Sequence, residues 1–190
     1  MSITKINADV MDLGDDYTFT GSVGGVGSNV KEMLVLRQDG IARTVSSGTY
    51  TPANITAAQT TTRTWTDCTG SSIAYTPPTG TTLVIYEFNW HMQYNICSWK
   101  FFIDSDEVVD FRQSTSGSDQ NYYFKHIIRI GDGADTDSAR YASWDSAKTL
   151  KLQVRDYSAT YLTNLHKIGY WEAGNQNWLV LPSITMTALS

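Results

Sequence analysis

The chain has 190 residues, of which 41% are hydrophobic, 12% aromatic and 17% charged, with a net charge of −5 at neutral pH. This length allows one substantial core, or a core with an extended segment. The acidic balance without clusters of Lys and Arg argues against a nucleic-acid partner, because phosphates are bound by clustered cations. We find no export signal and no apolar run that could cross a bilayer, so we expect a protein made in the cytoplasm without membrane insertion.

Residues 1–60 are rich in Gly, Ser, Thr and Asn, and we interpret them as an extended arm or stem followed by a linker, with one short strand at residues 32–38. Within residues 1–30 the apolar side chains stand apart. Ordering each residue costs about 1–2 kcal/mol of backbone entropy, which so few contacts within the chain cannot offset. The arm should therefore dock on a neighbouring subunit or another protein, or alternatively fold back and lengthen a sheet of its own domain. The expected anchors are Ile3, Met11, Leu13 and Phe19.

Residues 61–190 carry short apolar runs of strand length, separated by turn signals such as "PPTG", "STSGSDQ" and "GDGADTDS". About eight or nine strands in this part, with a single weak helical candidate at residues 137–148, are typical of a two-sheet sandwich or jelly roll. The sequence therefore predicts an all-β fold, an antiparallel β-sandwich of jelly-roll type, with an extended N-terminal arm.

The stretch from Thr81 to Asp104 has the clearest alternation in the chain. Successive side chains of a strand point to opposite faces, so we predict one long strand here with an apolar and a polar side. The apolar side holds Val84, Tyr86, Phe88, Trp90, Met92 and Tyr94, and the polar side holds Glu87, Asn89, His91 and Gln93. The apolar side should be the inner surface of one of two packed sheets.

Aromatic residues exceed what the inner surfaces can hold, so several should point outward. Outward aromatics with little charge indicate a subunit interface or a site where a glycan stacks. The candidates are Trp144, Tyr157, Tyr161 and Trp171.

Residues that could carry chemistry are few. Asp132, Asp135 and Asp137 could hold Ca²⁺, but their spacing fits no known calcium loop, and a solvated turn is favoured. The three histidines, His91, His126 and His166, have no partner at a metal-ligand spacing. Glu87 and Asp104 could be imagined as a glycosidase pair, although their places on a strand and in a turn explain both. We expect no enzyme, no cofactor and no metal.

Cys68 and Cys97 are the only cysteines. In a chain without an export signal we expect free, buried thiols, with a disulfide as the alternative.

Three parts of the sequence resemble structural proteins of tailed bacteriophages, particularly marine ones. The opening "ITKINADVMDLGDDYTFTGSV" looks like the segment that leads a fibre or decoration protein. The body "WTDCTGSSIAYTPPTGTTLVIYEFNWHM" and the close "WLVLPSITMTAL" look like the terminal domain of such proteins, which is similar to the trimer-forming jelly rolls of the C1q and tumour-necrosis-factor type.

The resemblance implies a homotrimeric virion protein, assembled on the particle surface through its arm and partnered by capsid, portal or tail proteins. Only about sixty residues precede the domain, which favours a short knob or decoration protein over a long receptor-reaching fibre. The alternative is a tail-fibre module that binds a polysaccharide of the host surface through exposed Trp and Tyr.

Overall fold

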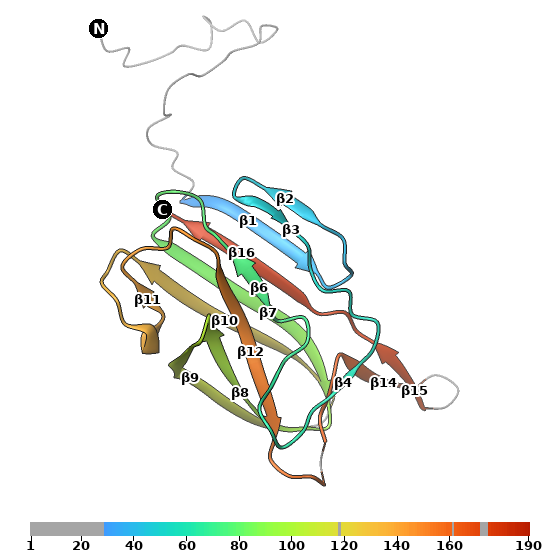
Figure 1. Ribbon diagram of the computed structural model, residues 1–190. Coiled ribbons are helices and arrows are strands. Elements are labelled where there is room, and N and C mark those ends of the chain that lie inside the picture. Colours follow the sequence, from blue (N-terminus) through green and yellow to red (C-terminus); the bar gives the residue numbers. More distant parts are fainter. Residues whose placement is uncertain (1–28, 118, 161, 172–174) are drawn as a thin grey trace, which may run out of the picture.

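The computed structural model describes residues 29–117, 119–160, 162–171 and 175–190. Two largely antiparallel β-sheets pack face to face in this part of the chain, and the only helical element is a 3-10 turn, η2 (Thr136–Ser138) (Figure 1). The predicted all-β sandwich is confirmed. The helical candidate at residues 137–148 becomes the end of η2, a loop and the short strand β11 (Arg140–Tyr141).

The larger sheet has seven strands in the order β1-β16-β7-β10-β11, and two short strands extend it: β13 pairs with the end of β7, and β4 pairs with β13. All pairings are antiparallel except that of β10 with β11. The strands introduced here are β1 (Val30–Arg37), β4 (Gln59–Thr60), β7 (Leu83–Gln93), β10 (Gln120–Ile130), β13 (Asn164–Leu165) and β16 (Ser183–Leu189).

The smaller sheet has five strands, in the order β5-β12-β8-β9 with β6 also paired to β12. They are β5 (Thr66–Asp67), β6 (Ile73–Tyr75), β8 (Asn95–Ile103), β9 (Asp106–Gly117) and β12 (Lys148–Asp156). The chain passes repeatedly from one sheet to the other, so that β7 and β10 of one sheet are joined through β8 and β9 of the other. This order, β1-β16-β7-β10 over β6-β12-β8-β9, is that of a jelly roll.

Two separate hairpins complete the described chain. The first is β2 (Arg43–Val45) with β3 (Gly48–Tyr50), and it lies beside β1. The second is β14 (Lys167–Trp171) with β15 (Asn175–Leu179), which extends away from the sandwich in Figure 1.

The core between the sheets is mostly aromatic. Tyr86 of the larger sheet stacks on Phe101 of the smaller one, with ring centres 5.3 Å apart, and Trp90 meets Trp99 edge to face at 5.8 Å. These side chains are at most 6% exposed. Because such rings bury large apolar areas, they provide much of the stabilisation that holds the two layers together.

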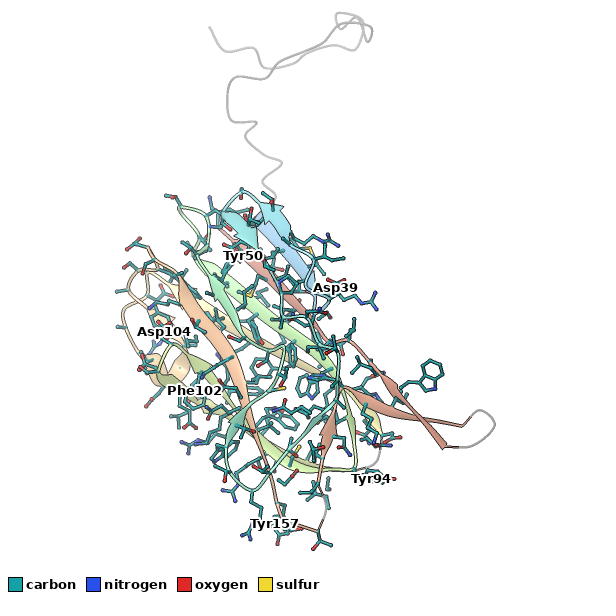
Figure 2. All side chains as sticks on the ribbon, turned by 45° about the vertical axis from the view of Figure 1, so that its right-hand side comes forward. Asp39, Tyr50, Tyr94, Phe102, Asp104 and Tyr157 are labelled. Atoms are coloured by element: carbon teal, nitrogen blue, oxygen red, sulfur yellow. The ribbon has the colours of Figure 1, made fainter. Side chains whose placement is uncertain are left out.

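The stretch from Thr81 to Asp104 forms two strands, so the prediction of one long strand is wrong. β7 ends at Gln93, the chain turns at Tyr94 with a φ of 58°, and β8 enters the opposite sheet. Even-numbered side chains from Val84 to Met92 point inward, whereas odd-numbered ones from Cys97 to Ile103 do so after the turn. Tyr94 lies on neither inner surface and is 62% exposed (Figure 2).

The outer side of β7 also departs from the expectation at one end. His91 and Gln93, placed on the polar side, are only 3% and 5% exposed. β13 pairs with the end of β7, and β14 approaches so closely that a Cβ at Gly169 would lie 3.0 Å from the side-chain nitrogen of Gln93. A strand's own alternation does not reveal a later segment that covers its outer face.

The described part of residues 1–60 packs along the sandwich. β1 pairs with β16, and its alternate residues Leu34 and Leu36 are buried at 1% and 2% exposure. Further along, Ile55 is 5% exposed, so residues placed in a linker also contribute to the buried interior. At the start of β1, the carbonyl of Asn29 accepts a hydrogen bond from the backbone N–H of Ser190, so the arm joins the domain beside the C-terminus.

Candidate functional site

The aromatic candidates have different fates. Tyr157 is 76% exposed, at the end of the sandwich opposite Tyr50 (Figure 2). Trp144 is 5% exposed and donates its indole N–H to the carbonyl of Tyr75, so its ring is a core residue rather than a platform for a glycan or another subunit. Tyr161 and the side chain of Trp171 lie outside the described residues, as do the expected arm anchors Ile3, Met11, Leu13 and Phe19.

The acidic loop does not assemble a cation site in the described residues. Asp135 accepts a hydrogen bond from Arg140 at 2.6 Å, and Asp132 lies 3.9 Å from Arg129. The arginine of the first pair lowers the pKa of Asp135. No group of three or more His, Cys, Asp or Glu side chains that could hold a metal occurs in the part of the chain that the structure describes, and Asp137 joins none.

The side chains of the three histidines have different surroundings, although the backbone N–H of His166 donates to the carbonyl of His91 at 2.7 Å. His91 shares a hydrogen bond of 2.9 Å with Asn121, and His126 lies among the rings of Phe101, Phe111 and Phe124. His166 is fully buried, with its Nε2 2.8 Å from the carbonyl of Thr69, and burial lowers its pKa to about 4. These environments are those of structural histidines.

The imagined glycosidase pair is not brought together on one surface. Glu87 lies on the outer side of the larger sheet, where it accepts a hydrogen bond from Tyr123 and pairs with Lys125. Asp104 lies in the turn between β8 and β9 of the smaller sheet, where it accepts the backbone N–H of Thr149 (Figure 2).

Cys68 and Cys97 are both free and buried, as expected. Burial raises the pKa of both thiols, that of Cys97 to about 12, so neither has the character of a nucleophile.

The outer side of the larger sheet carries an exposed apolar strip. One row across four strands joins Met33, Thr187, Ile85 and Ile127, which are direct neighbours in register, and Val35 lies in the next row. Met33, Val35 and Ile127 are 60%, 51% and 50% exposed. Large apolar side chains gathered on one sheet face, rather than scattered singly, mark an interaction surface.

Cations frame this strip. Lys31 and Arg37 lie on the outer side of β1, and Lys125 and Arg129 lie on the outer side of β10, whereas Glu87 is the carboxylate at the centre. We call this surface the apolar-basic face. It comprises Lys31, Met33, Val35, Arg37, Ile85, Glu87, Lys125, Ile127, Arg129, Thr185 and Thr187.

A buried carboxylate on the inner side of β1 holds the edge strand of the apolar-basic face in place. Glu32 of β1 is 6% exposed and accepts hydrogen bonds from the Ser46 hydroxyl at 2.5 Å, the Ser47 backbone and hydroxyl at 2.7 and 2.6 Å, and Tyr75 at 2.9 Å. Burial alone would raise the pKa of Glu32, but these donors outweigh it and lower the pKa. The network ties β1, the β2–β3 hairpin and β6 together.

The outer side of the smaller sheet is hollowed instead. A hollow of about 270 Å³ is lined by Trp65, Ser98, Lys100, Arg112 and Ser114, among others. A second hollow of about 240 Å³ shares Ser98 and Ser114 with the first and reaches Tyr157. We call the two together the Trp65 groove. It comprises Trp65, Ile96, Ser98, Lys100, Arg112, Gln113, Ser114, Ser116 and Tyr157.

The strand registers build this groove. Ser98 of β8 lies between Ser114 of β9 and Arg155 of β12, and Lys100 lies directly opposite Arg112. The ammonium of Lys100 is 4.9 Å from the centre of the Trp65 ring, and the guanidinium of Arg155 is 5.7 Å from it. Glu107 binds both Lys100, at 2.9 Å, and Arg112, at 2.5 Å.

We compared the chain with known proteins. No protein-family model matches it, and no curated protein matches it in sequence. Among solved structures it is similar to a chain of infectious bursal disease virus strain Gx, with 10% identity over 83% of this chain and 37% of that chain and a TM-score of 0.34. A chain of strain Gt gives 8% identity over 94% and 44%, with a TM-score of 0.35. This chain therefore spans less than half the length of either, and we infer its function from its own surfaces.

Neither surface was identified from the sequence. Trp65 opens "WTDC", whose strand character is visible, but its neighbours Lys100, Arg112 and Arg155 come from three other strands. The apolar-basic face had a local signal, because four consecutive residues of "VKEMLVLR", from Met33 to Leu36, are apolar, so that both faces of the strand carry apolar side chains there. Finally, no helix in the described part of the chain is long and apolar enough to cross a membrane.

Proposed function

We propose that this protein is a virion structural protein, a homotrimeric β-sandwich that forms a knob-like fibre or a decoration on a bacteriophage particle. In this proposal residues 1–28 attach to a capsid, portal or tail protein, and the sandwich faces outward. The role is architectural rather than enzymatic, and the protein carries it out at the particle surface.

The apolar-basic face is the observation that supports the proposed trimer. Met33, Val35 and Ile127 are each at least half exposed on a sheet face that spans four strands. We infer that a neighbouring copy of this chain covers it. Of the four cations of the face, Lys125 pairs with Glu87 and Arg129 lies 3.9 Å from Asp132. The whole chain has a net charge of −5, so the remainder of a second copy offers complementary charge to Lys31 and Arg37. In a trimer such a face would meet a different patch of the next copy, and the ring would close.

The virion assignment rests on the sequence resemblance of the opening and closing segments to phage structural proteins, and the jelly-roll strand order is compatible with it. The place where the arm joins the domain supports a docking role. Asn29 lies beside Ser190 at one end of the sandwich, so that the arm and the opposite end of the domain can serve different partners.

The experiment is a reconstitution on particles. Virions that lack the protein are incubated with the purified full chain or with a chain that lacks residues 1–28, and light scattering gives the mass of each free protein. We expect a trimer for both proteins, and particle binding only for the full chain. A full chain that is monomeric at micromolar concentration contradicts the trimer, and a truncated chain that binds particles as well as the full one contradicts the docking role.

A second function, binding of a host polysaccharide, is compatible with a knob that faces outward. The specific observation that favours it is the Trp65 groove with the exposed Tyr157 at its end.

A further inference from the structure

The Trp65 groove consists of two small hollows that share part of their lining. Its two hollows, of about 270 and 240 Å³, adjoin at Ser98 and Ser114. Each is slightly smaller than the roughly 300 Å³ at which pockets for drug-sized ligands begin, so each suits a group of about one sugar ring. The groove has an aromatic ring at each end, Trp65 and Tyr157.

The serine hydroxyls of the groove have no hydrogen-bond partner among the described residues. In the part of the chain that the structure describes, no protein group hydrogen-bonds the hydroxyls of Ser98, Ser114 or Ser116. Arg155 likewise makes no ion pair with any described residue, and its guanidinium lies over the Trp65 ring. These groups remain available to hydroxyl and carboxylate groups of a ligand.

The charge of the groove differs from that of the chain. Lys100 and Arg112 line the groove with Trp65, and Arg155 lies at its edge, over the same ring. Glu107 pairs with Lys100 and Arg112, and Asp137 is a second carboxylate close enough to act on Arg112. Of the two cations bound by Glu107, Arg112 is the more accessible, with 55% of its side chain exposed, compared with 22% for Lys100. A positive cluster on a chain of net charge −5 indicates that the ligand of this site is an anion.

We propose that the Trp65 groove binds an acidic polysaccharide. The C–H face of a sugar ring packs on the indole of Trp65, Arg112 and Arg155 bind carboxylates of the glycan, and Ser98, Ser114 and Ser116 bind its hydroxyls. Tyr157 provides a second stacking position one or two sugars further along. The site is built entirely within one chain, and it does not depend on the virion role proposed above.

Two other ligand classes are disfavoured by the same observations. A nucleic acid would be held by many phosphate contacts, and the groove offers three cations on an acidic chain. A neutral glycan would use Trp65 and the serines but would give Arg155 no partner. The row of free hydroxyls beside the cations fits a ligand that carries both hydroxyls and carboxylates.

The test is calorimetric titration of the full-length protein with an oligouronate of six sugars, with oligosialic acid, with a neutral β-glucan of the same length and with single-stranded DNA. We expect one of the two acidic glycans to bind at least about tenfold more tightly than the neutral glycan and the DNA, and to bind more weakly as salt rises from about 50 to about 200 mM. Failure of both acidic glycans to bind overturns the proposal, as does DNA or neutral glycan that binds equally well.

Substitutions locate the site. Trp65→Ala and Arg155→Gln should each weaken binding about tenfold, because each removes one of the principal contacts. Trp65→Phe keeps a ring and should retain part of the affinity, which separates stacking from folding, and the thermal unfolding midpoint of every variant is measured alongside.

The matched controls lie elsewhere on the surface. Trp178→Ala removes an indole that is 52% exposed on the β14–β15 hairpin, and Lys125→Gln removes a cation from the apolar-basic face. Both should bind within about twofold of the unmodified protein, since neither residue lines the groove. If Trp178→Ala loses binding while Trp65→Ala keeps it, the groove is not the site.

Discussion

The two outer sheet faces of this sandwich have the same origin and opposite characters. Each consists of the alternate side chains that β-strands turn away from a shared core. On the larger sheet they form the apolar-basic face, where Met33 and Ile127 are exposed. On the smaller sheet they form the Trp65 groove, where Lys100, Glu107 and Arg112 are linked by ion pairs. Alternation therefore decides which residues leave the core, whereas the pairing of distant strands decides what surface they make.

The difference suggests a division of labour. Exposed aliphatic side chains gain free energy when another surface removes them from water, which suits a permanent subunit contact. Cations and hydroxyls around one indole gain more from a polar ligand, which suits reversible binding. In the proposed assembly the larger sheet would face its neighbours, and the smaller sheet would remain open.

The largest effect is expected from Ile127→Asp on the apolar-basic face. A trimer contains three copies of the substitution, and each would bury a carboxylate without a partner, so we expect a monomer at concentrations where the unmodified chain is a trimer. Light scattering measures the mass. Ile41→Asp is the matched control, because Ile41 is 56% exposed but lies in the loop after β1. Equal masses for the two variants would remove the apolar-basic face from the interface.

The next effect concerns what holds the edge of that face in place. Glu32→Gln should lower the free energy of unfolding by about 2–3 kcal/mol, because the amide loses the charge that four hydrogen bonds address and directs an N–H group at other donors. Urea unfolding at neutral pH measures the loss. Ser46→Ala removes one donor only and should cost about 1 kcal/mol. A Glu32→Gln protein as stable as the original would show that the network contributes no net stability.

The fold was largely predictable, and the reasons can be seen in single strands. From Val84 to Met92 every second residue is apolar, and all five are buried. The turn at Tyr94 was missed although a signal existed: the alternating apolar residues have even numbers up to Met92 and odd numbers from Trp99 to Ile103, and such a change of phase indicates a new strand. The candidate sites were less predictable, because a surface such as the Trp65 groove depends on the registers of β5, β12, β8 and β9 together. Trp144 was wrong in the other direction. Its polar sequence neighbours suggested an outward side chain, but tertiary contacts bury it.

A lower pH should reduce the stability of the whole fold, and therefore of both outer faces, because His166 is buried. Its pKa is lowered to about 4 from the ordinary 6.5 by burial, so the unfolded chain takes up a proton between these values while the folded one does not. Stability should therefore fall as the pH decreases from about 6.5 to about 4, by roughly 2–3 kcal/mol from this residue.

The variant that tests the pH dependence is His166→Asn, since Asn tolerates the φ of 63° at this position. Its unfolding free energy, measured between pH 7.5 and about 4.5, should change less with pH than that of the unmodified chain. Burial also lowers the pKa of His126, so that His126→Asn is the companion variant that accounts for the remainder. An unchanged slope in the His166→Asn protein would assign the pH dependence to other groups.

The smallest effect should come from Glu107→Gln. This variant tests whether a residue of the Trp65 groove affects ligand binding without affecting stability. Glu107 holds Lys100 and Arg112 in ion pairs whose members are 18–55% exposed, and such surface pairs contribute less than about 1 kcal/mol to stability. In the Trp65 groove the same carboxylate competes with an acidic ligand for both cations. Its removal should therefore leave stability almost unchanged and tighten binding of the acidic glycan about two- to fivefold at low salt, with a smaller gain at high salt.

Asp135→Asn is the matched control, because it also removes one negative charge from a pair with an arginine, at 2.6 Å, but at a site outside the groove. If Glu107→Gln weakens binding instead, the carboxylate serves as an acceptor for ligand hydroxyls or positions the two cations, and the ligand is then not chosen by the positive charge of the groove.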